Sequence, residues 1–438
     1  MSRPPAARLR GEGRTQPPPH RVTALPSGLR VVTLEMPAME SVSLGIWIGT
    51  GGRYESPRLN GVSHFLEHLL FKGTDRRSAR RLSQEIESVG GSLNGFTGEE
   101  YTCYMAKVLH RHLRRAANVL FDMYLHASLK AEDVEKERTV IREEINMYLD
   151  MPAQHVTDLF NAVLWPGQPL GRPLVGTAET VGAFTPDDLR AYRARHYLPK
   201  NTVVAAAGKV AHEELVRIVE RLAPGGPGRP APRSAPAADR QRRPALLLCD
   251  KKTEQTHLCV GVRGYRREHP DRYALHLLSI ALGENMSSRL FQSVRERHGL
   301  AYAIGSSVIR YRDTGAFSVH AGVENNKFLR ALRLILRELA SVRDEGLRPA
   351  ELARAKEYWT GQFAMEFEKT TRNMLGIGEG LLLTGRVLTK EEILSNIARV
   401  GLDDVRRVAA DIFRERRLNL AAIGPAVGGT AAHDALHL

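Results

Sequence analysis

The stretch GVSHFLEHLLFKG, residues 61–73, has the apolar periodicity of a helix that buries one face in a core. His64 and His68 are separated by about one helical turn, so both imidazoles project from one face and can bind a single metal ion. Glu67 lies on the same side, where a carboxylate can accept a proton from water. The same pattern also fits a chance arrangement of core or solvated histidines, so this stretch alone leaves both interpretations open.

A second helix, predicted over residues 131–149, offers a further ligand for such a metal. Glu137 and Glu144 are seven residues apart in it, and two helical turns place them on one face. A metal site that performs hydrolysis needs three protein ligands and one open position, so one of these carboxylates could complete it. The alternative is a solvated acidic face, because the helix carries three more glutamates: Glu132, Glu135 and Glu143.

The chain has 438 residues, 42% of them hydrophobic, and a net charge of +14. Two proline-rich, arginine-rich segments, 1–22 and 224–245, each carry five Arg against one acid and so supply +8 of that charge. Neither segment can bury enough apolar surface to offset its ordering entropy, so we expect both to be disordered. The charge therefore sits mostly in tails and linkers, and a nucleic-acid-binding protein is only a remote alternative.

The cysteine content and the length of the apolar runs indicate the cellular compartment of the protein. The three cysteines form no CxxC pair, so no disulfide framework is expected. No apolar run approaches the roughly 18 residues of a membrane span, so we expect no transmembrane segment. The first 22 residues lack the apolar core of a secretory signal, and their prolines oppose the amphipathic helix of a transit peptide. These features favour a bacterial cytoplasm over a mitochondrial matrix.

The linker 224–245 divides the chain into two halves whose elements follow the same order. We predict a basic tail (1–22), a catalytic domain (23–223), the linker, a second domain (246–425) and a C-terminal tail (426–438). The expected fold class is α+β, with two homologous domains, each an antiparallel sheet with helices on one face. A shift of 211 positions places His64, Glu67 and His68 on Leu275, Leu278 and Ser279, so no second metal site is expected.

Four separated motifs resemble those of the pitrilysin/insulysin family of zinc peptidases, the inverted zincins. They are HFLEHLLFKGT (64–74), GGSLNGFTGEEYTCY (90–104), EKERTVIREEINMY (135–148) and SSRLFQSVRERHGLAY (287–302). The similarity extends from about Pro26 to Gly424 and is greatest to the branch of the mitochondrial processing peptidase β subunit and its half-size bacterial relatives. The resemblance implies a zinc metalloendopeptidase with one Zn²⁺ per chain.

The resemblance also implies roles for individual residues. His64, His68 and Glu144 would bind zinc, with Glu143 as the adjacent alternative, and Glu67 would be the general base. Glu137 would contact a zinc ligand rather than the metal itself and adjust the properties of the site. Asn94, on an edge strand, would hold the substrate backbone. Arg295 and Tyr302, in the second half, would grip the substrate and donate a hydrogen bond to the oxyanion.

In the family, two half-size chains close into a clam-shell that admits unfolded peptides. The resemblance therefore implies peptide substrates, including presequence-like basic segments, and a homodimer or a heterodimer with a related subunit. Arg295 and Tyr302 would then serve the zinc of the opposite subunit. Acidic residues expected near the cleft (Glu99, Glu100 and Glu143) are compatible with basic substrates. The alternative within the family is a catalytically silent partner subunit or peptide-binding scaffold, which the intact histidines and distal glutamate disfavour.

Overall fold

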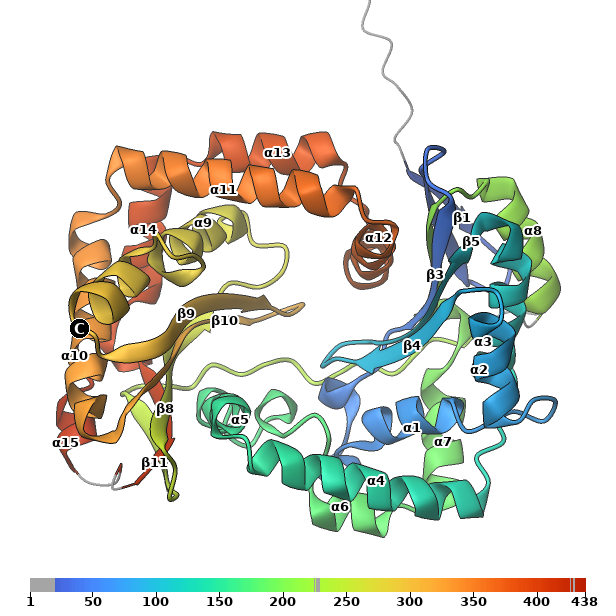
Figure 1. Ribbon diagram of the computed structural model, residues 1–438, viewed down its shortest axis with the longest axis horizontal. Helices are drawn as coiled ribbons and strands as arrows, with labels where there is room; N and C mark the ends of the chain where they lie inside the picture. The colour runs from blue at the N-terminus through green and yellow to red at the C-terminus, as the bar shows by residue number, and fades with distance from the viewer. Residues whose placement is uncertain (1–19, 224, 226–228, 426, 428–429) are drawn as a thin grey trace, which may run out of the picture.

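The computed structural model describes residues 20–223, 225, 229–425, 427 and 430–438. Two halves, each built from one sheet and a set of helices, lie side by side in Figure 1, with the first half on the right. The helix predicted over residues 131–149 is present with those bounds, and the stretch 61–73 forms a helix from Val62 to Leu70. The predicted α+β class with two similar domains is confirmed.

The first sheet has six strands in the order β1-β2-β6-β3-β5-β4. Its strands are β1 (His20–Ala24), β2 (Arg30–Glu35), β3 (Ser41–Ile48), β4 (Ser92–Thr97), β5 (Thr102–Leu109) and β6 (Thr202–Gly208). All neighbours are antiparallel except β2 and β6, which are parallel. The sheet is thus mixed rather than purely antiparallel, and β4 is a free edge.

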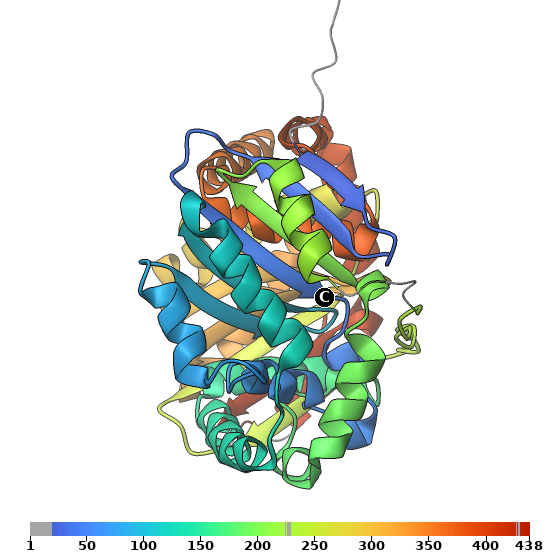
Figure 2. The same ribbon diagram turned by 90° about the vertical axis from the view of Figure 1, so that its right-hand side faces the viewer.

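Helices of the first half cover one face of this sheet, as Figure 2 shows from the right-hand side. They are α1 (Val62–Leu70), α2 (Ala79–Glu87), α3 (Leu113–His126), α4 (Ala131–Leu149), α6 (Ala178–Ala183), α7 (Pro186–His196) and α8 (His212–Leu222). The core between helices and sheet consists of aliphatic and aromatic side chains that alternate along the strands, such as Leu44 and Ile46 of β3.

The second half repeats this plan with five strands in the order β7-β11-β8-β10-β9. Its strands are β7 (Ala245–Asp250), β8 (Gln255–Gly264), β9 (Ala301–Arg310), β10 (Gly315–Glu324) and β11 (Asn419–Gly424). Its helices are α9 (Arg272–Gly283), α10 (Phe328–Glu345), α11 (Pro349–Phe367), α13 (Lys390–Arg399), α14 (Leu402–Ile412) and α15 (Thr430–Asp434). Again one pair, β7 and β11, is parallel. Strands β7 and β9 form the two edges of the sheet.

The halves exchange one helix each, which the sequence did not predict. Helix α5 (Pro152–Leu164) leaves the first half and buries Phe160 and Leu164 against the face of the second sheet that the second half's own helices leave open. Helix α12 (Thr370–Thr384) does the reverse, packing Met374 and Leu381 against the face of the first sheet that the first half's own helices leave open. Each sheet is therefore covered on both faces, and each half completes the core of the other (Figure 1).

Buried ion pairs reinforce this contact between halves. Arg53 of the first half binds Glu100 at 2.8 Å and Asp313 of the second half at 2.5 Å. Glu100 also accepts the backbone N–H of Arg312 at 3.0 Å. The side chains of Arg53 and Glu100 are only 2% and 3% exposed, so these bonds are shielded from competing water.

Both segments predicted to be disordered need correction where the structure describes them. Strand β1 begins at His20, so the end of the predicted tail 1–22 pairs with β2; residues 1–19 lie outside the described residues. Up to Pro244 the described linker residues have no regular structure, and Ala245 begins β7. Hydrogen bonds nevertheless fix the path of the linker, including Ala238 N–H to Gln168 at 2.7 Å and Gln241 to Leu418 O at 3.0 Å. Composition missed this because the partners come from the two halves.

The predicted C-terminal tail is also part of the fold where it is described. It contains α15, and the side chains of Ala432 and Leu436 are buried in the core of the second half. Among the described residues, no helix is both long and apolar enough to cross a membrane.

Candidate metal centre

The helix that carries the histidines has a start fixed by a buried carboxylate. Glu55 accepts the backbone N–H groups of Gly61 at 2.7 Å and Ser63 at 2.8 Å, two donors that have no partner within the helix. Gly61 precedes the helix with φ +93°, a conformation that favours glycine. Phe65 and Leu66 are fully buried below, so the opposite face of α1 presents its polar residues.

Helices α1 and α4 bring the predicted ligands together. Nε2 of His64 lies 3.6 Å from Oε1 of Glu144, and Nε2 of His68 lies 3.5 Å from Oε2 of the same carboxylate. Three donor groups thus converge on one point from two elements. Glu143, the adjacent alternative, is exposed and points away around the helix.

Glu137 holds His68 from the other side of the ring. Its Oε2 is 3.2 Å from Nδ1 of His68, and its Oε1 binds Nζ of Lys72 at 2.6 Å. A proton on Nδ1 directed at Glu137 leaves the Nε2 lone pair facing Glu144, which is the tautomer that a metal ligand needs. Burial lowers the pKa of His68, but the hydrogen bond to Glu137 and the nearby carboxylates outweigh it, so the net shift is upward.

Glu67 has the protonation behaviour of a general base near neutrality. Burial, with a smaller contribution from the Glu144 charge and against the attraction of His68, raises its pKa to about 7. Its Oε1 lies against the backbone of β4, because a Cβ built on Gly95 would approach that oxygen to 2.9 Å. Glycine at position 95 therefore lets the edge strand lie directly beside Glu67.

The donor set fits a transition metal such as zinc. Suitable atoms of His64, Glu67 and His68 lie within 4.8 Å of one another, and Glu144 adds a second carboxylate. Burial lowers the pKa of His64 to about 3, so its ring is neutral and can bind a cation. Two imidazoles with a carboxylate are a common zinc set, and the remaining carboxylate is then free to act as a base.

Asn94 lies on the free edge strand β4, as predicted, and its side chain is exposed. Its Oδ1 accepts the N–H of Gly95 at 2.8 Å, and its amide nitrogen has no protein partner among the described residues. The residue is therefore one position from the glycine that faces Glu67.

Arg295 and Tyr302 lie together in the second half and not at the histidines. Arg295 is in a π-helical segment (Phe291–Arg297), and Tyr302 is the second residue of the edge strand β9. The guanidinium lies 5.4 Å from the centre of the Tyr302 ring. The Tyr302 side chain is 76% exposed. Within the described parts of the chain, neither residue contacts the cluster on α1 and α4.

Sheet register shows which residues of the second half correspond to the cluster. One rung crosses the first sheet through Gly95, Tyr104, Ile46 and Val204. The equivalent rung crosses the second sheet through Ser306, Val319, Val260 and Leu420. Val204 and Leu420 are equivalent because each lies three residues beyond the short 3₁₀ helix before its strand.

This register corrects the predicted shift by one residue. Gly95 faces Glu67, and Ser306 hydrogen-bonds Ser279 at 3.1 Å, so Glu67 corresponds to Ser279 at a shift of 212. His64 then corresponds to His276 and His68 to Ile280. The shift of 211 was estimated from matches between apolar residues. Such matches cannot distinguish 211 from 212, because α9 has consecutive leucines at 277 and 278.

His276 is a buried histidine without the rest of a metal site. Its ring packs on Trp359 at 4.2 Å, and its nearest carboxylate is Glu284 at 3.8 Å. Burial lowers its pKa to about 3. Across the described residues, the one group of three or more suitable metal ligands is that on α1.

The structure adds residues that the sequence analysis did not single out. Lys72 binds Glu137, and its position four residues beyond His68 was an available signal. Tyr148 lies one turn from Glu144, and burial together with the Glu144 charge raises the pKa of its phenol. Of the acidic residues expected near the cleft, Glu100 is instead buried in the ion pair with Arg53, which is a correction.

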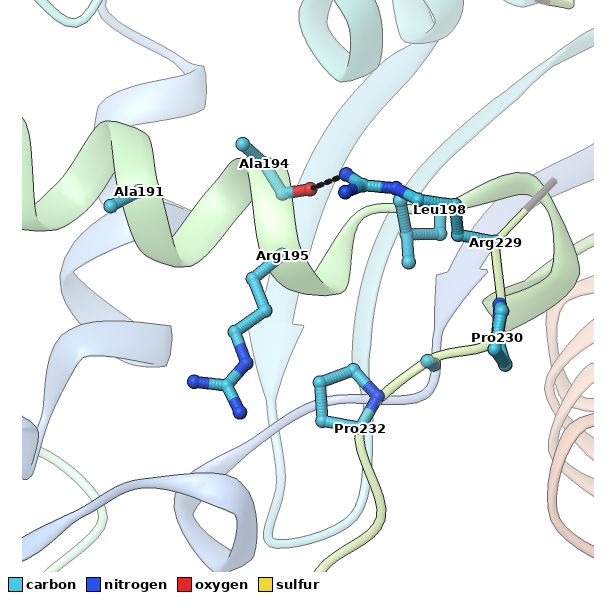
Figure 3. Close-up of a pocket in the computed structure, with 8 residues that line it drawn as sticks. Ala191, Ala194, Arg195, Leu198, Arg229, Pro230 and Pro232 are labelled. Atoms are coloured by element: carbon cyan, nitrogen blue, oxygen red, sulfur yellow. Dashed lines mark hydrogen bonds between the residues drawn. The ribbon is translucent and has the colours of Figure 1, made fainter.

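A cavity of about 430 Å³ lies elsewhere, between α7 and residues 229–232 (Figure 3). Arg195, Pro230 and Pro232 line it, and Arg229 donates to the Ala194 carbonyl at 3.4 Å. Neither carboxylates nor histidines line it, so the chemistry described above belongs to the cluster on α1 and α4 rather than to this cavity.

Comparison with known families identifies the chain. The family described as "Insulinase (Peptidase family M16)" matches residues 30–178, and "Peptidase M16 inactive domain" matches residues 183–358. The chain therefore belongs to peptidase family M16. The first match covers the half with the histidine cluster, and the second falls mostly on the half without it.

Bacterial relatives share most of the chain. A Streptomyces coelicolor protein named as an uncharacterized zinc protease is 42% identical, over 95% of this chain and 92% of its own. A Bacillus subtilis protein of the same description is 37% identical, over 91% and 97%. The fold matches a Helicobacter pylori protease structure with a TM-score of 0.87 at 22% identity, covering 93% of this chain and 100% of that one.

Proposed function

We propose that the chain is a zinc-dependent endopeptidase that hydrolyses unfolded peptides. The observation that carries this proposal is the convergence of His64, His68 and Glu144, with Glu67 beside them at a pKa near 7. The names of the bacterial relatives and the family match support the same activity. We assign one zinc per chain, bound by the two histidines and Glu144.

Zinc, when bound, would polarise the scissile carbonyl and lower the pKa of water, which makes hydroxide available near neutrality. Glu67 removes a proton from the attacking water and passes it to the leaving amine. Glu137 and Lys72 keep His68 in the tautomer that binds the metal. Asn94 and the free edge of β4 align an extended substrate by backbone hydrogen bonds.

Arg295 and Tyr302 would act on substrate held by a second subunit, homologous or identical. In support of this, Tyr302 is highly exposed on an edge strand, and the exchanged helices and buried ion pairs join the two halves of one chain firmly. A phenolic hydroxyl there can donate to the developing oxyanion.

The test is hydrolysis of a quenched-fluorescent unfolded peptide by purified protein, by chelated protein and by protein to which zinc has been restored. Glu67→Gln should retain zinc and lose about 10²–10⁴ of the rate, the range expected for a general base. A Glu67→Gln protein that retains most of its turnover would refute the proposal. Zinc binding without cleavage, even with a related subunit added, would favour a silent scaffold.

A further inference from the structure

The cavity between α7 and residues 229–232 is lined by two arginines without an acidic partner (Figure 3). Arg195, in the last turn of α7, makes no hydrogen bond or ion pair through its guanidinium with any described residue. Arg229 donates one hydrogen bond to the Ala194 carbonyl at 3.4 Å. A guanidinium has five N–H donors, so both groups retain most of their hydrogen-bonding capacity. The described side chains around the cavity therefore leave two positive charges unpaired.

The two guanidinium groups occupy different ends of this cavity. In Figure 3 the Arg195 side chain extends away from α7 on the side of Pro232, whereas the guanidinium of Arg229 meets α7 at Ala194. A single carboxylate or phosphate at one end would leave the guanidinium at the other end unpaired. A ligand that neutralises both arginines must therefore carry two anionic groups that are held apart.

The rest of the cavity lining is apolar. It consists of Ala191, Ala194, Leu198, Pro230, Ala231 and Pro232. The proline rings fix the backbone φ angle of the linker at two positions, so this wall keeps its shape without a ligand. The volume of about 430 Å³ lies within the roughly 300–1,000 Å³ that is usual for small-molecule sites. Apolar surface between two charges favours an organic ligand with a hydrocarbon centre over a hydrated inorganic ion.

The acidic residues of α7 are paired elsewhere. Asp187, one turn before Ala191, binds Arg190 at 2.9 Å, and Asp188 binds Arg58 at 2.7 Å. Neither aspartate lines the cavity. The C-terminal end of α7 attracts the two arginines, but a helix end contributes only about half an elementary charge against their two full charges. The local charge balance therefore favours a dianion.

We propose that this cavity binds a small aliphatic dicarboxylate, with one carboxylate at Arg195, the other at Arg229 and the hydrocarbon chain against the alanine and proline wall. The bound ligand joins α7 of the first half to the linker that leads to the second half. The site shares no residue with the metal cluster. The inference is therefore independent of the proposed peptidase function, and failure of either one leaves the other unaffected.

The experiment is a ligand-detected NMR titration of the full-length chain at constant ionic strength. The probes are the linear dicarboxylates from succinate to suberate, each compared with the monocarboxylate of the same carbon number, such as hexanoate for adipate. We expect an optimum length, because two guanidinium groups at fixed positions suit one separation of the carboxylates. The best dicarboxylate should bind about fivefold more tightly than its monocarboxylate, which is the upper range for one additional exposed ion pair.

Substitutions of the two arginines locate the site. Arg195→Gln and Arg229→Gln should each bring the ratio of the two affinities close to one, because each variant retains a single guanidinium. Arg233→Gln is the matched control: it removes an exposed arginine of the same linker that does not line the cavity, and it should leave the ratio unchanged. Circular dichroism shows whether the variants are folded.

Four results would overturn the inference: no preference for the dicarboxylate, no optimum length, a ratio that survives both substitutions, or an equal loss in Arg233→Gln. The last result would indicate a general attraction of anions to the basic linker. Thermal melting gives an independent measurement, because a ligand that binds only the folded chain raises its melting temperature. The best dicarboxylate, well above its Kd, should raise the melting temperature of the wild type but not of Arg195→Gln. An unchanged wild-type melting temperature would also contradict the proposed site.

Discussion

The two halves of this chain share the order of five strands, an equivalent parallel pair and long helices of equal length, but among the described residues only one half has the metal-type cluster. Leu66 in α1 and Leu278 in α9 are equivalent at the corrected shift, and both are fully buried. The polar positions diverge instead: Ser279 replaces Glu67 and Ile280 replaces His68. The comparison teaches that core residues maintain the fold while a few residues on one helix face determine the chemistry.

Helix α4 and its counterpart α11 show the same division. The seventh position is Glu137 in one and Ala355 in the other, and both side chains are buried. A buried carboxylate is costly without partners, and in α4 it has His68 and Lys72. In the second half Ile280 replaces His68, so a carboxylate at position 355 would have no imidazole to bind. Alanine at this position avoids the cost of desolvating a charge.

The largest expected effect separates the two halves by metal content. His68→Ala should abolish zinc binding and activity, because it removes one of three ligands. His276→Ala should retain one zinc per chain, since its neighbours Trp359 and Ile280 cannot bind the ion. Metal analysis of purified proteins checks both, with circular dichroism to show that the variants are folded. Loss of zinc in His276→Ala would contradict the prediction that only the first half binds the metal.

The exchanged helices predict the next largest effect. Phe160→Ala should lower the free energy of unfolding by about 3–5 kcal/mol, because it leaves a cavity between α5 and the second sheet. The lower free energy of unfolding should affect both halves, since each half contributes a helix to the core of the other. Denaturant titration with hydrogen exchange resolved by half measures this, and Met374→Ala gives the reciprocal case on the first sheet. Unfolding of the second half alone at lower denaturant would contradict the shared core.

A smaller effect concerns the residue that orients His68. Glu137→Gln should weaken zinc binding by about 10–100-fold, because it removes the charge that fixes the imidazole tautomer. Competition with a chromophoric chelator measures the affinity. Glu143→Gln, on the exposed side of the same helix, is the control and should bind zinc as tightly as the wild type. Weaker binding in that variant would instead make Glu143 the ligand.

A further prediction concerns the pH dependence of stability. Burial, assisted by Glu55 and Asp158, raises the pKa of Glu99 from 4.5 to about 8. The folded protein thus keeps a proton that the unfolded chain releases above about 4.5, so this group costs stability progressively as pH rises from about 4.5 to 8.

Glu99→Gln should therefore melt at a higher temperature than the wild type at pH 8 and at a similar temperature at pH 4.5. Glu40→Gln, at a side chain that is 75% exposed, serves as the control and should change neither value. A Glu99→Gln protein with the same pH profile as the wild type would show that Glu99 is ionised when folded. The measurement also tests whether the first half contains a buried carboxyl that lowers the stability of the folded protein at high pH.

Sequence periodicity predicted the helices, the duplicated plan and the polar face of α1, because these depend on spacings of three and four residues within one element. The spacing within α4 indicated Glu137 and Glu144 as candidates, and similarity to a family selected Glu144 as a ligand. The assignment of Arg295 and Tyr302 rested on that similarity alone, and the structure places them in the other half.

What only the tertiary structure decided involves contacts between distant segments. The exchange of α5 and α12 could not be predicted, because an amphipathic helix does not specify which of two similar sheets it covers. The fixed path of the linker depends on hydrogen-bond partners such as Gln168 and Leu418, which lie far away in sequence. The correspondence of His64 with His276 required sheet register, since local apolar pattern tolerates a slip of one residue and hydrogen-bonded rungs do not.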